Sequence, residues 1–215
     1  MVVMDKATAH EIIDGSLLGD AGLVKKYSRG NPYFWIDLSG EEHIDWLHIL
    51  KTSLLSMGVS VTDKCPKITP RISTLRGKTR EYKEVALWSS CSPLLLPFYL
   101  RWYPYSKKVV PTDLQLTPLV IAHWFMGDGS SWWMSGRPNL VRVKFCTNSL
   151  PLSNIDWLAN QLNNKRGIIA IRYKSSPVLF INDAASVSRL MKMIEPHLVP
   201  SFSYKVKYPT LKRLK

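Results

Sequence analysis

The sequence predicts an α+β protein made of two pseudo-symmetric halves, each with the element order α-β-β-α-β-β-α. One observation is an apolar segment of helical length that ends in Gly-Asp and a small residue, and that occurs twice, at residues 12–22 and 119–130. Another is the spacing, because Asp20 and Asp128 lie 108 residues apart in a chain of 215. A motif repeated at half the chain length indicates a duplicated domain with an internal two-fold axis.

The first half is expected to contain seven elements. They are a motif helix at 7–19, strands at 23–27 and 33–38, a helix from 39 or 40 to about 57, strands at 68–75 and 79–88, and a short helix at 93–103. Thr8 is a candidate N-cap of the motif helix, with Glu11 three residues later as in a capping box. Pro97 is expected to bend the last helix.

The second half repeats this order after a linker. The predicted domains are residues 1–104 and 116–215, joined by a linker at 105–115. The elements of the second half are a motif helix from 116 or 118 to 126, strands at 132–134 and 140–147, a helix capped by Ser153 that runs to about 164, strands at 168–174 and 178–182, a helix at 184–195 and an irregular basic tail at 196–208. Apolar and basic residues alternate at 141–145, which predicts one buried and one cationic strand face.

The motif helices are expected to pack on each other. Gly15 and Gly19 are four residues apart, so they share one helix face. A glycine inside a helix costs roughly 0.5–1 kcal/mol relative to alanine, and close approach of a second backbone is the usual compensation. Ala122 and Gly127 offer a weaker version of the same small face in the second copy. Such a pair would deliver both motif aspartates to the same end.

Two carboxylates at neighbouring helix C-termini repel each other and the helix dipoles. Divalent cations would remove that repulsion, and Mg²⁺ prefers carboxylates, backbone carbonyls and water as ligands. Two metal ions side by side can stabilise the attacking and leaving oxygens of a phosphodiester displacement. The plainer alternative is two ordinary apolar helices that each end in a Gly-Asp turn, and the repetition at half length favours the metal site.

Composition favours a polyanionic partner. The net charge is +13, and 46% of the residues are hydrophobic, which is enough for a folded core. Residues 1–104 hold 13 basic and 11 acidic residues, whereas residues 105–215 hold 16 and 5. No apolar run approaches the roughly 20 residues that a membrane span needs, so no membrane partner is expected. A basic scaffold protein could show similar totals, so charge alone leaves that alternative open.

The three cysteines and the N-terminus favour an intracellular protein. Three is an odd number and no Cys-x-x-Cys pair occurs, so neither a disulfide framework nor a zinc site is indicated. The first residues lack the basic flank and apolar core of a signal peptide, and they do not look like a transit peptide. The expected location is an organelle or the cytoplasm of a prokaryote.

Basic and aromatic side chains on the expected strands are candidates for DNA contact. A two-stranded ribbon at 68–88 fits the major groove, where arginine and lysine reach guanine edges. A solvated hairpin with charges for solubility is the alternative. The side chains expected to contact DNA are Lys25, Lys26, Arg29, Tyr33, Trp35, Lys67, Arg71, Arg76, Lys78, Arg80, Tyr82, Arg137, Arg142, Lys144, Arg172 and Lys174.

The two motifs resemble the paired signature helices of the LAGLIDADG homing endonucleases, in the single-chain form with two motifs. Leu-Thr-Pro at 116–118, Trp-Phe-Met-Gly-Asp-Gly at 124–129, Pro-His-Leu-Val-Pro at 196–200 and Ser-Tyr-Lys at 203–205 resemble the intron-encoded, monomeric branch of that family. The resemblance runs from about His10 to Tyr208. Ala21 stands where the family usually has glycine, a small change because alanine is also compact.

The resemblance implies a monomeric nuclease that cuts both strands of a long, asymmetric DNA site and leaves 3′ overhangs. Asp20 and Asp128 would be the metal-binding catalytic acids, the carbonyls of Gly19 and Gly127 would add ligands, and Lys108 and Lys205 would be the basic catalytic partners. Mg²⁺ is the implied cofactor, with Mn²⁺ able to substitute and Ca²⁺ expected to bind without supporting cleavage. The two curved antiparallel sheets would form one DNA-binding saddle, with the motif helices at the central interface.

Two other functions stay open for this fold. One is an RNA maturase that binds its own intron RNA, and the other is a DNA-binding regulator that does not cleave. Both motif acids are present, which favours the nuclease without excluding a role in RNA folding.

Overall fold

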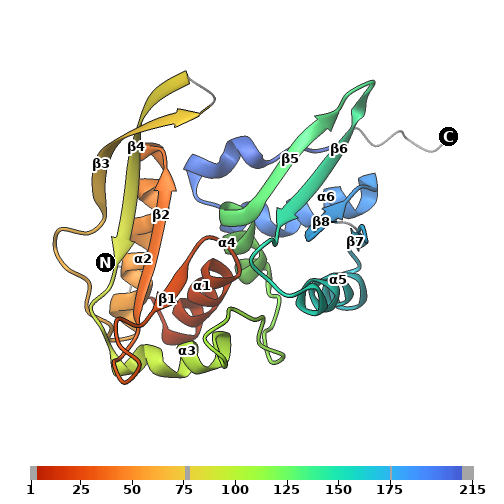
Figure 1. The fold of residues 1–215 in the computed structure, drawn as a ribbon. Coiled ribbons are helices and arrows are strands. Elements are labelled where there is room, and N and C mark those ends of the chain that lie inside the picture. Colours follow the sequence, from red (N-terminus) through yellow and green to blue (C-terminus); the bar gives the residue numbers. More distant parts are fainter. Residues whose placement is uncertain (1–3, 76–77, 175, 210–215) are drawn as a thin grey trace. The chain divides into compact units, whose positions relative to one another are not determined.

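The structure is a computed structural model that describes residues 4–75, 78–174 and 176–209. The chain divides into two compact units. The first runs to Arg101 and takes in Val199–Ser201, and the second comprises Trp102–Leu198 and the chain from Phe202 onward. Each unit holds one four-stranded antiparallel sheet and its own helices (Figure 1). The predicted α+β class, with the same element order in both halves, is therefore confirmed.

The first unit carries the sheet with strand order β1-β2-β4-β3. Its elements are α1 (Lys6–Leu18), β1 (Gly22–Val24), β2 (Tyr33–Ser39), a 3₁₀ turn (Glu41–His43), α2 (Ile44–Ser56), β3 (Lys67–Leu75), β4 (Lys78–Trp88), a second 3₁₀ turn (Pro93–Leu95) and α3 (Leu96–Trp102, whose last residue belongs to the second unit).

Helix α1 begins earlier than the sequence predicts. Its N-cap is Asp5, whose carboxylate accepts hydrogen bonds from the Thr8 backbone N–H (2.9 Å) and from the Thr8 hydroxyl (2.7 Å). The prediction that Thr8 caps this helix with Glu11 was wrong. Asp5, three residues upstream, is the N-cap, and its carboxylate accepts from the backbone N–H of Thr8. Farther along α1, Asp14 accepts bonds from Arg101 Nη1 at 2.8 and 2.9 Å, which fixes α3 against α1.

The two faces of the first sheet differ in burial. Phe34, Ile36 and Leu38 alternate along β2 and are buried, on the face that packs against the helices. Trp35 and Asp37 lie between them on the opposite face, which we call outer face 1. Because cross-strand partners point to the same side, this register assigns the residues of β3 and β4 to a face as well.

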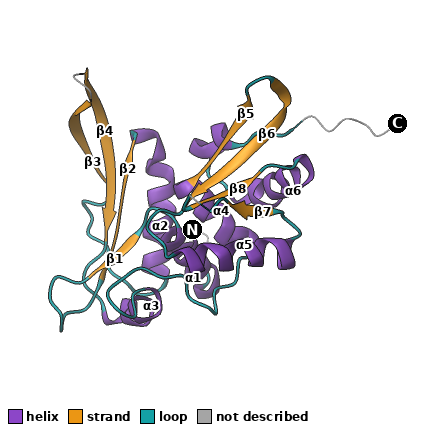
Figure 2. Ribbon diagram, turned by 45° about the vertical axis from the view of Figure 1, so that its right-hand side comes forward, coloured by secondary structure: helices purple, strands orange, loops and turns teal. Residues whose placement is uncertain are grey.

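The second unit carries the sheet with strand order β5-β6-β8-β7. Its elements are α4 (Pro118–Asp128), β5 (Gly129–Met134), β6 (Arg137–Cys146), α5 (Leu152–Arg166), β7 (Ala170–Arg172), β8 (Val178–Ile181), α6 (Ala184–Ile194) and 3₁₀ turns at Glu195–His197 and Pro200–Lys205 (Figure 2). The tail predicted to be irregular thus includes two 3₁₀ turns.

Helix α5 also begins one residue before its predicted cap. Pro151 occupies the N-cap position, and its carbonyl accepts bonds from the N–H groups of Asn154 (3.0 Å) and Ile155 (3.2 Å). Ser153 therefore lies inside the helix. The fixed φ of proline suits an entry into the first helical turn.

The core of the second unit confirms the alternation predicted for residues 141–145. Val141, Val143 and Phe145 are buried, and the ring of Phe145 stacks on Trp124 of α4 at 4.0 Å between centroids. The opposite face, outer face 2, carries the basic residues that lie between them.

In the segment 105–115, Val110 is buried, and its N–H donates to Asn154 Oδ1 at 2.8 Å, so this segment packs within the second unit. The helices of residues 4–75, 78–174 and 176–209 include none that could cross a membrane.

Candidate functional site

The first motif aspartate follows the end of α1. The N–H of Gly19 donates to the carbonyls of Ser16 (3.1 Å) and Gly15 (3.4 Å), and the N–H of Ala21 donates to Ser16 (3.0 Å). These bonds close the last turn while Gly19 takes a non-helical conformation (φ −91°, ψ −133°). Gly19 is buried and Asp20 is exposed. The helix therefore ends by presenting one carboxylate to solvent.

The second motif aspartate is the last residue of α4. Asp128 is half-buried, and Gly129 begins β5 directly after it. A Cβ on Gly129 would lie 2.2 Å from Phe125 Cδ2 and 2.5 Å from the Phe125 carbonyl oxygen. Only glycine fits there, so the chain can leave the helix immediately after the acid.

Lys205 lies at the same helix end. Its ammonium donates to the carbonyl of Met126 at 2.6 Å and to that of Gly127 at 3.2 Å, and it lies 3.4 Å from that of Phe125. The carbonyl of Phe125 also accepts from the N–H of the C-cap residue Gly129. A cation at a helix C-terminus opposes the partial negative charge of the last carbonyls. The structure thus brings Lys205 into the turn that ends at Asp128. Gly127, a predicted metal ligand, already accepts one bond and keeps a second lone pair.

The first motif aspartate has an acidic neighbour that sequence reasoning missed. Burial raises the pKa of Asp37, and the negative charges of Glu84 and Asp20 raise it further, with Arg71 acting in the opposite direction. The strand register places Asp37 on outer face 1, opposite Ala86. The sequence did contain a signal for Asp37: it lies in the alternating segment 33–38, two residues after Trp35 and therefore on the same strand face.

The equivalent position in the second unit holds a thiol. Gly22 pairs with Trp35, and Ser130 pairs with Lys144, so the residues two steps farther along each strand are Asp37 and Cys146. The first unit therefore has a second carboxylate near its motif acid. The second unit has Cys146, which is half-buried.

The oxygen donors near the helix ends fit a hard divalent cation. Carboxylates and backbone carbonyls are the ligands that Mg²⁺ prefers, and the repulsion felt by Asp37 is the kind that a cation relieves. Within residues 4–75, 78–174 and 176–209, no group of three or more His, Cys, Asp and Glu side chains gathers as a complete metal site. A cation held here would need main-chain oxygens or water beside the acids. Lys108, the other predicted basic partner, is half-buried in the second unit.

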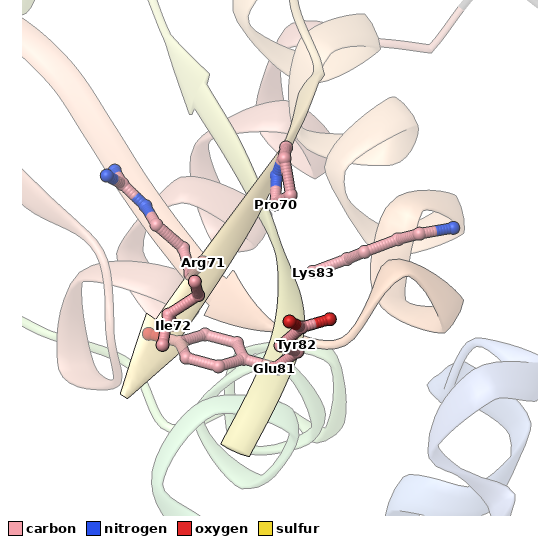
Figure 3. A pocket seen from close by; sticks show the side chains of 6 residues that line it. All are labelled: Pro70, Arg71, Ile72, Glu81, Tyr82 and Lys83. Carbon is pink, nitrogen blue, oxygen red and sulfur yellow. The ribbon is translucent and has the colours of Figure 1, made fainter. Parts of the chain in front are cut away.

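Outer face 1 collects many of the side chains expected to contact DNA. Arg71 pairs with Tyr82 across the β3–β4 ribbon, and Arg80 lies opposite Ser73. Arg71 and Lys83 point to opposite sides of this ribbon (Figure 3). The Arg71 guanidinium bonds to Glu84 Oε1 at 2.8 Å, which limits how freely it can reach outward. The residues expected from the sequence that the register places on this face are Tyr33, Trp35, Lys67, Arg71, Arg80 and Tyr82.

Outer face 2 carries basic residues stacked on aromatic rings. The Lys144 ammonium lies 5.9 Å from the Trp132 ring centroid, and the Arg142 guanidinium lies 5.9 Å from that of Phe180. Such cation–π contacts hold the charges in place without neutralising them. Arg137 at the start of β6 and Lys174 after β7 are exposed.

Some residues expected at the DNA contact lie elsewhere. Arg172 shares the helix-facing side of its sheet with buried Leu179, and it bonds to both carboxylate oxygens of Asp156 at 2.7 and 2.9 Å. The expectation that Arg172 lies on the polar outer side was wrong, because the register of β7 with β8 places it beside Leu179 on the helix-facing side. The Lys25 ammonium lies 4.7 Å from the Tyr99 ring centroid.

The remaining side chains expected to contact DNA lie in loops or outside the residues that the structure describes. Lys26 and Arg29 are exposed in the β1–β2 loop. Arg76 lies outside the described residues, and Lys78 is described only as the first residue of β4.

Comparison with known proteins identifies relatives over most of the chain. The model of the LAGLIDADG DNA endonuclease family matches residues 10–184. The cytochrome b mRNA maturase bI2 of Debaryomyces hansenii is 30% identical over 205 residues, covering 91% of this chain and 72% of the relative. The protein of the same name from Saccharomyces cerevisiae is 29% identical over 208 residues, and the match covers 91% of this chain and 46% of that relative.

The fold has a counterpart among solved structures. The homing endonuclease I-WcaI, solved bound to its DNA recognition sequence, matches with a TM-score of 0.77 and 17% sequence identity, over 97% of this chain and 89% of that one. At this identity the match establishes the fold. Together with the family model, which spans both motif aspartates, it answers the question that the repeated motif raised: the chain belongs to the LAGLIDADG DNA endonuclease family.

Proposed function

We propose that this protein is a site-specific DNA endonuclease that makes a double-strand break with 3′ overhangs and depends on Mg²⁺. The observation that carries the proposal is that both halves retain the motif acid at the end of its helix, Asp20 after α1 and Asp128 at the end of α4. A protein that only bound nucleic acid would not need a carboxylate at either helix end, where the dipole disfavours it.

In this proposal each unit supplies one carboxylate to the reaction. Asp20 in the first unit and Asp128 in the second would each serve as a cation ligand, and the carbonyls of Gly19 and Gly127 are further ligands. A bound Mg²⁺ would supply an acidic water and positive charge at the phosphate oxygens. Lys205 holds the turn that carries Asp128 through its bonds to the helix carbonyls. Its charge also stabilises negative charge that develops near that turn.

The two outer faces are the proposed DNA contact. Phosphate contacts by their basic residues would set affinity and make it depend on salt, whereas contacts to base edges would set sequence preference. The faces differ in chemistry, because outer face 1 has the Arg71–Tyr82 pair and outer face 2 has Lys144 over Trp132. A recognition site read by two different faces is asymmetric.

A cleavage selection tests the proposal. The protein is incubated with a randomised duplex library or, if the host gene is known, with the ligated exon junction, in Mg²⁺, Mn²⁺ or Ca²⁺. Asp20→Asn and Asp128→Asn are run beside it, and Asp63→Asn, at an exposed loop position, is the control. Double-strand cuts with 3′ overhangs in Mg²⁺ that both motif variants lose, and the control keeps, are expected. Tight binding of DNA without cleavage in any of the three metals would refute the proposal that the protein is an endonuclease.

A second candidate function is RNA maturation, which the names of the two yeast relatives favour. On this alternative the same fold binds intron RNA and promotes its folding, alone or beside DNA cleavage. The assay is splicing of the host intron transcript. Splicing that persists in Asp20→Asn and Asp128→Asn would establish a role separate from the nuclease. The absence of any effect on splicing would leave cleavage as the sole activity.

A further inference from the structure

Outer face 1 has an aromatic region apart from its cationic ribbon. Tyr33 and Trp35 come from β2 and Trp88 comes from β4, and Trp35 and Trp88 are direct cross-strand partners. The side chain of Trp35 is 39% exposed although the neighbouring Phe34 and Ile36 are fully buried on the other side of the same strand. These rings are therefore displayed on the surface and are not part of the core.

The three rings line a cavity of about 620 Å³. Lys26, which is exposed, contributes an ammonium to its lining, and the exposed Ser90 contributes a hydroxyl. On the neighbouring strand β1, the cross-strand partner of Trp35 is Gly22, which adds no side chain. The cavity thus combines wide apolar planes with the positive charge of Lys26 and the polar groups of Ser89 and Ser90. Its size is within the range of pockets that hold small ligands, about 300–1,000 Å³.

We propose that this cavity binds one unstacked nucleobase of a single-stranded RNA segment. An aromatic ring stacks on the face of a base, and this contact is strong and tolerant of sequence because every base has a π-face. Lys26 is placed to contact a phosphate beside that base, and the Ser90 hydroxyl to contact the base edge or a 2′-hydroxyl. The inference rests on the nucleic-acid-binding part of the proposed function and not on cleavage.

Duplex DNA does not offer what this cavity recognises. Bases in a duplex are stacked on each other and present only their edges in the grooves. Arginine and lysine read those edges, and outer face 1 holds such residues in the β3–β4 ribbon, at Arg71 and Arg80. Recognition of RNA, in contrast, targets unpaired bases that can be splayed out onto aromatic side chains. The face thus carries two regions suited to two forms of nucleic acid.

Binding measurements with three probes test this inference. The probes are a labelled 12-nucleotide RNA of mixed sequence, a single-stranded DNA of the same sequence and the corresponding DNA duplex. Trp35→Leu and Trp88→Leu are each expected to weaken RNA binding about 5- to 100-fold, and Trp35→Phe is expected to restore RNA binding. Trp88 is not among the expected DNA contacts, so Trp88→Leu should change duplex binding less than about twofold. Trp133→Leu, at a tryptophan of similar exposure (44%) outside the cavity, is the matched control and should bind RNA as the wild type does.

A second measurement uses the unaltered protein, so it does not depend on how the variants fold. Cys91 lines the cavity and its thiol is exposed, whereas Cys65 is buried. Bound RNA is expected to slow alkylation of Cys91, measured by mass spectrometry, more than duplex DNA does.

The outcomes separate the alternatives. Wild-type RNA affinity in both leucine variants, or equal protection of Cys91 by duplex DNA, would overturn the inference in favour of a groove contact. Single-stranded DNA that binds as tightly, with the same losses in the variants, would overturn the assignment to RNA. DNA cleavage is scored separately, so failure of the nuclease proposal leaves the RNA result intact.

Discussion

Lys205 has one structural role and one proposed catalytic role, which two substitutions can separate. Its ammonium bonds to carbonyls at the end of α4, so Lys205→Met leaves those groups without that partner. We expect the variant to lower the free energy of unfolding by about 1.5–3 kcal/mol, the range for hydrogen bonds to charged groups. Urea titration measures this effect, with Lys192→Met on the exposed side of α6 as the control.

Lys205→Arg then tells whether the charge also acts in catalysis. The guanidinium can donate to the same carbonyls, and we expect it to recover most of the stability. If cleavage stays low while stability recovers, Lys205 contributes to the reaction beyond holding the turn. Full recovery of both would show that its role is to position the turn that carries Asp128.

Asp37 makes stability depend on pH in a direction opposite to that of a salt-bridged acid. Its pKa is raised in the folded protein, so between the ordinary value of 3.8 and that raised value the folded state binds more protons than the unfolded state. Stability therefore falls as pH rises through this window. We expect Asp37→Asn to be more stable than the wild type at pH 7, by less than about 1 kcal/mol because the group is partly exposed.

The pH-dependent part of the difference between Asp37→Asn and the wild type should shrink as pH falls through this window, and it should be lost well below pH 3.8, where Asp37 is protonated in both states. Thermal unfolding in metal-free buffer at several pH values measures it. Asp63→Asn, at an exposed loop position outside the strands, is the control. A variant that is less stable than the wild type at pH 7 would show that Asp37 makes a favourable contact in its charged form.

At the scale of elements, α4 is an apolar helix with a titratable group in its buried part. Val120–Met126 are all buried, and this stretch includes His123. Burial lowers the pKa of His123 from 6.5 to about 3, and the positive charge of His197 contributes. The neutral form is therefore favoured in the folded state, so stability is lost as pH falls from 6.5 toward 3.

His123→Leu is expected to remove that acid sensitivity. The wild type should lose about 3 kcal/mol between pH 6.5 and pH 4 through this residue, and the variant should have a flatter profile. Chemical unfolding at pH 7, 5 and 4 measures the profile, and His48→Leu, at an exposed position of α2, is the control. Equal slopes in His123→Leu and the wild type would place the acid sensitivity elsewhere.

The elements show what sequence patterns can and cannot predict. The motif helices, the two ribbons and the order of elements were predictable, because apolar periodicity reports burial. Helix starts were not. The Asp5 carboxylate caps α1 by accepting from the N–H of Thr8, and Pro151 occupies the N-cap of α5 without a side-chain hydrogen bond. The contacts of Arg172 with Asp156 and of Asp37 with its acidic neighbours were also hidden, because they depend on strand register and on helices distant in sequence.

At the scale of the whole molecule, the net charge of +13 predicts strongly salt-dependent binding to nucleic acid. Each basic residue that contacts a phosphate contributes about one unit to the slope of log K against log salt concentration. Lys144 is held on outer face 2 over Trp132, so Lys144→Met should lower that slope by about one and weaken binding to all duplex sequences alike. Lys165→Met, at an exposed position in the last turn of α5, should leave the slope unchanged. A loss confined to one DNA sequence would instead assign Lys144 to a base edge, because a contact to phosphate carries no sequence information.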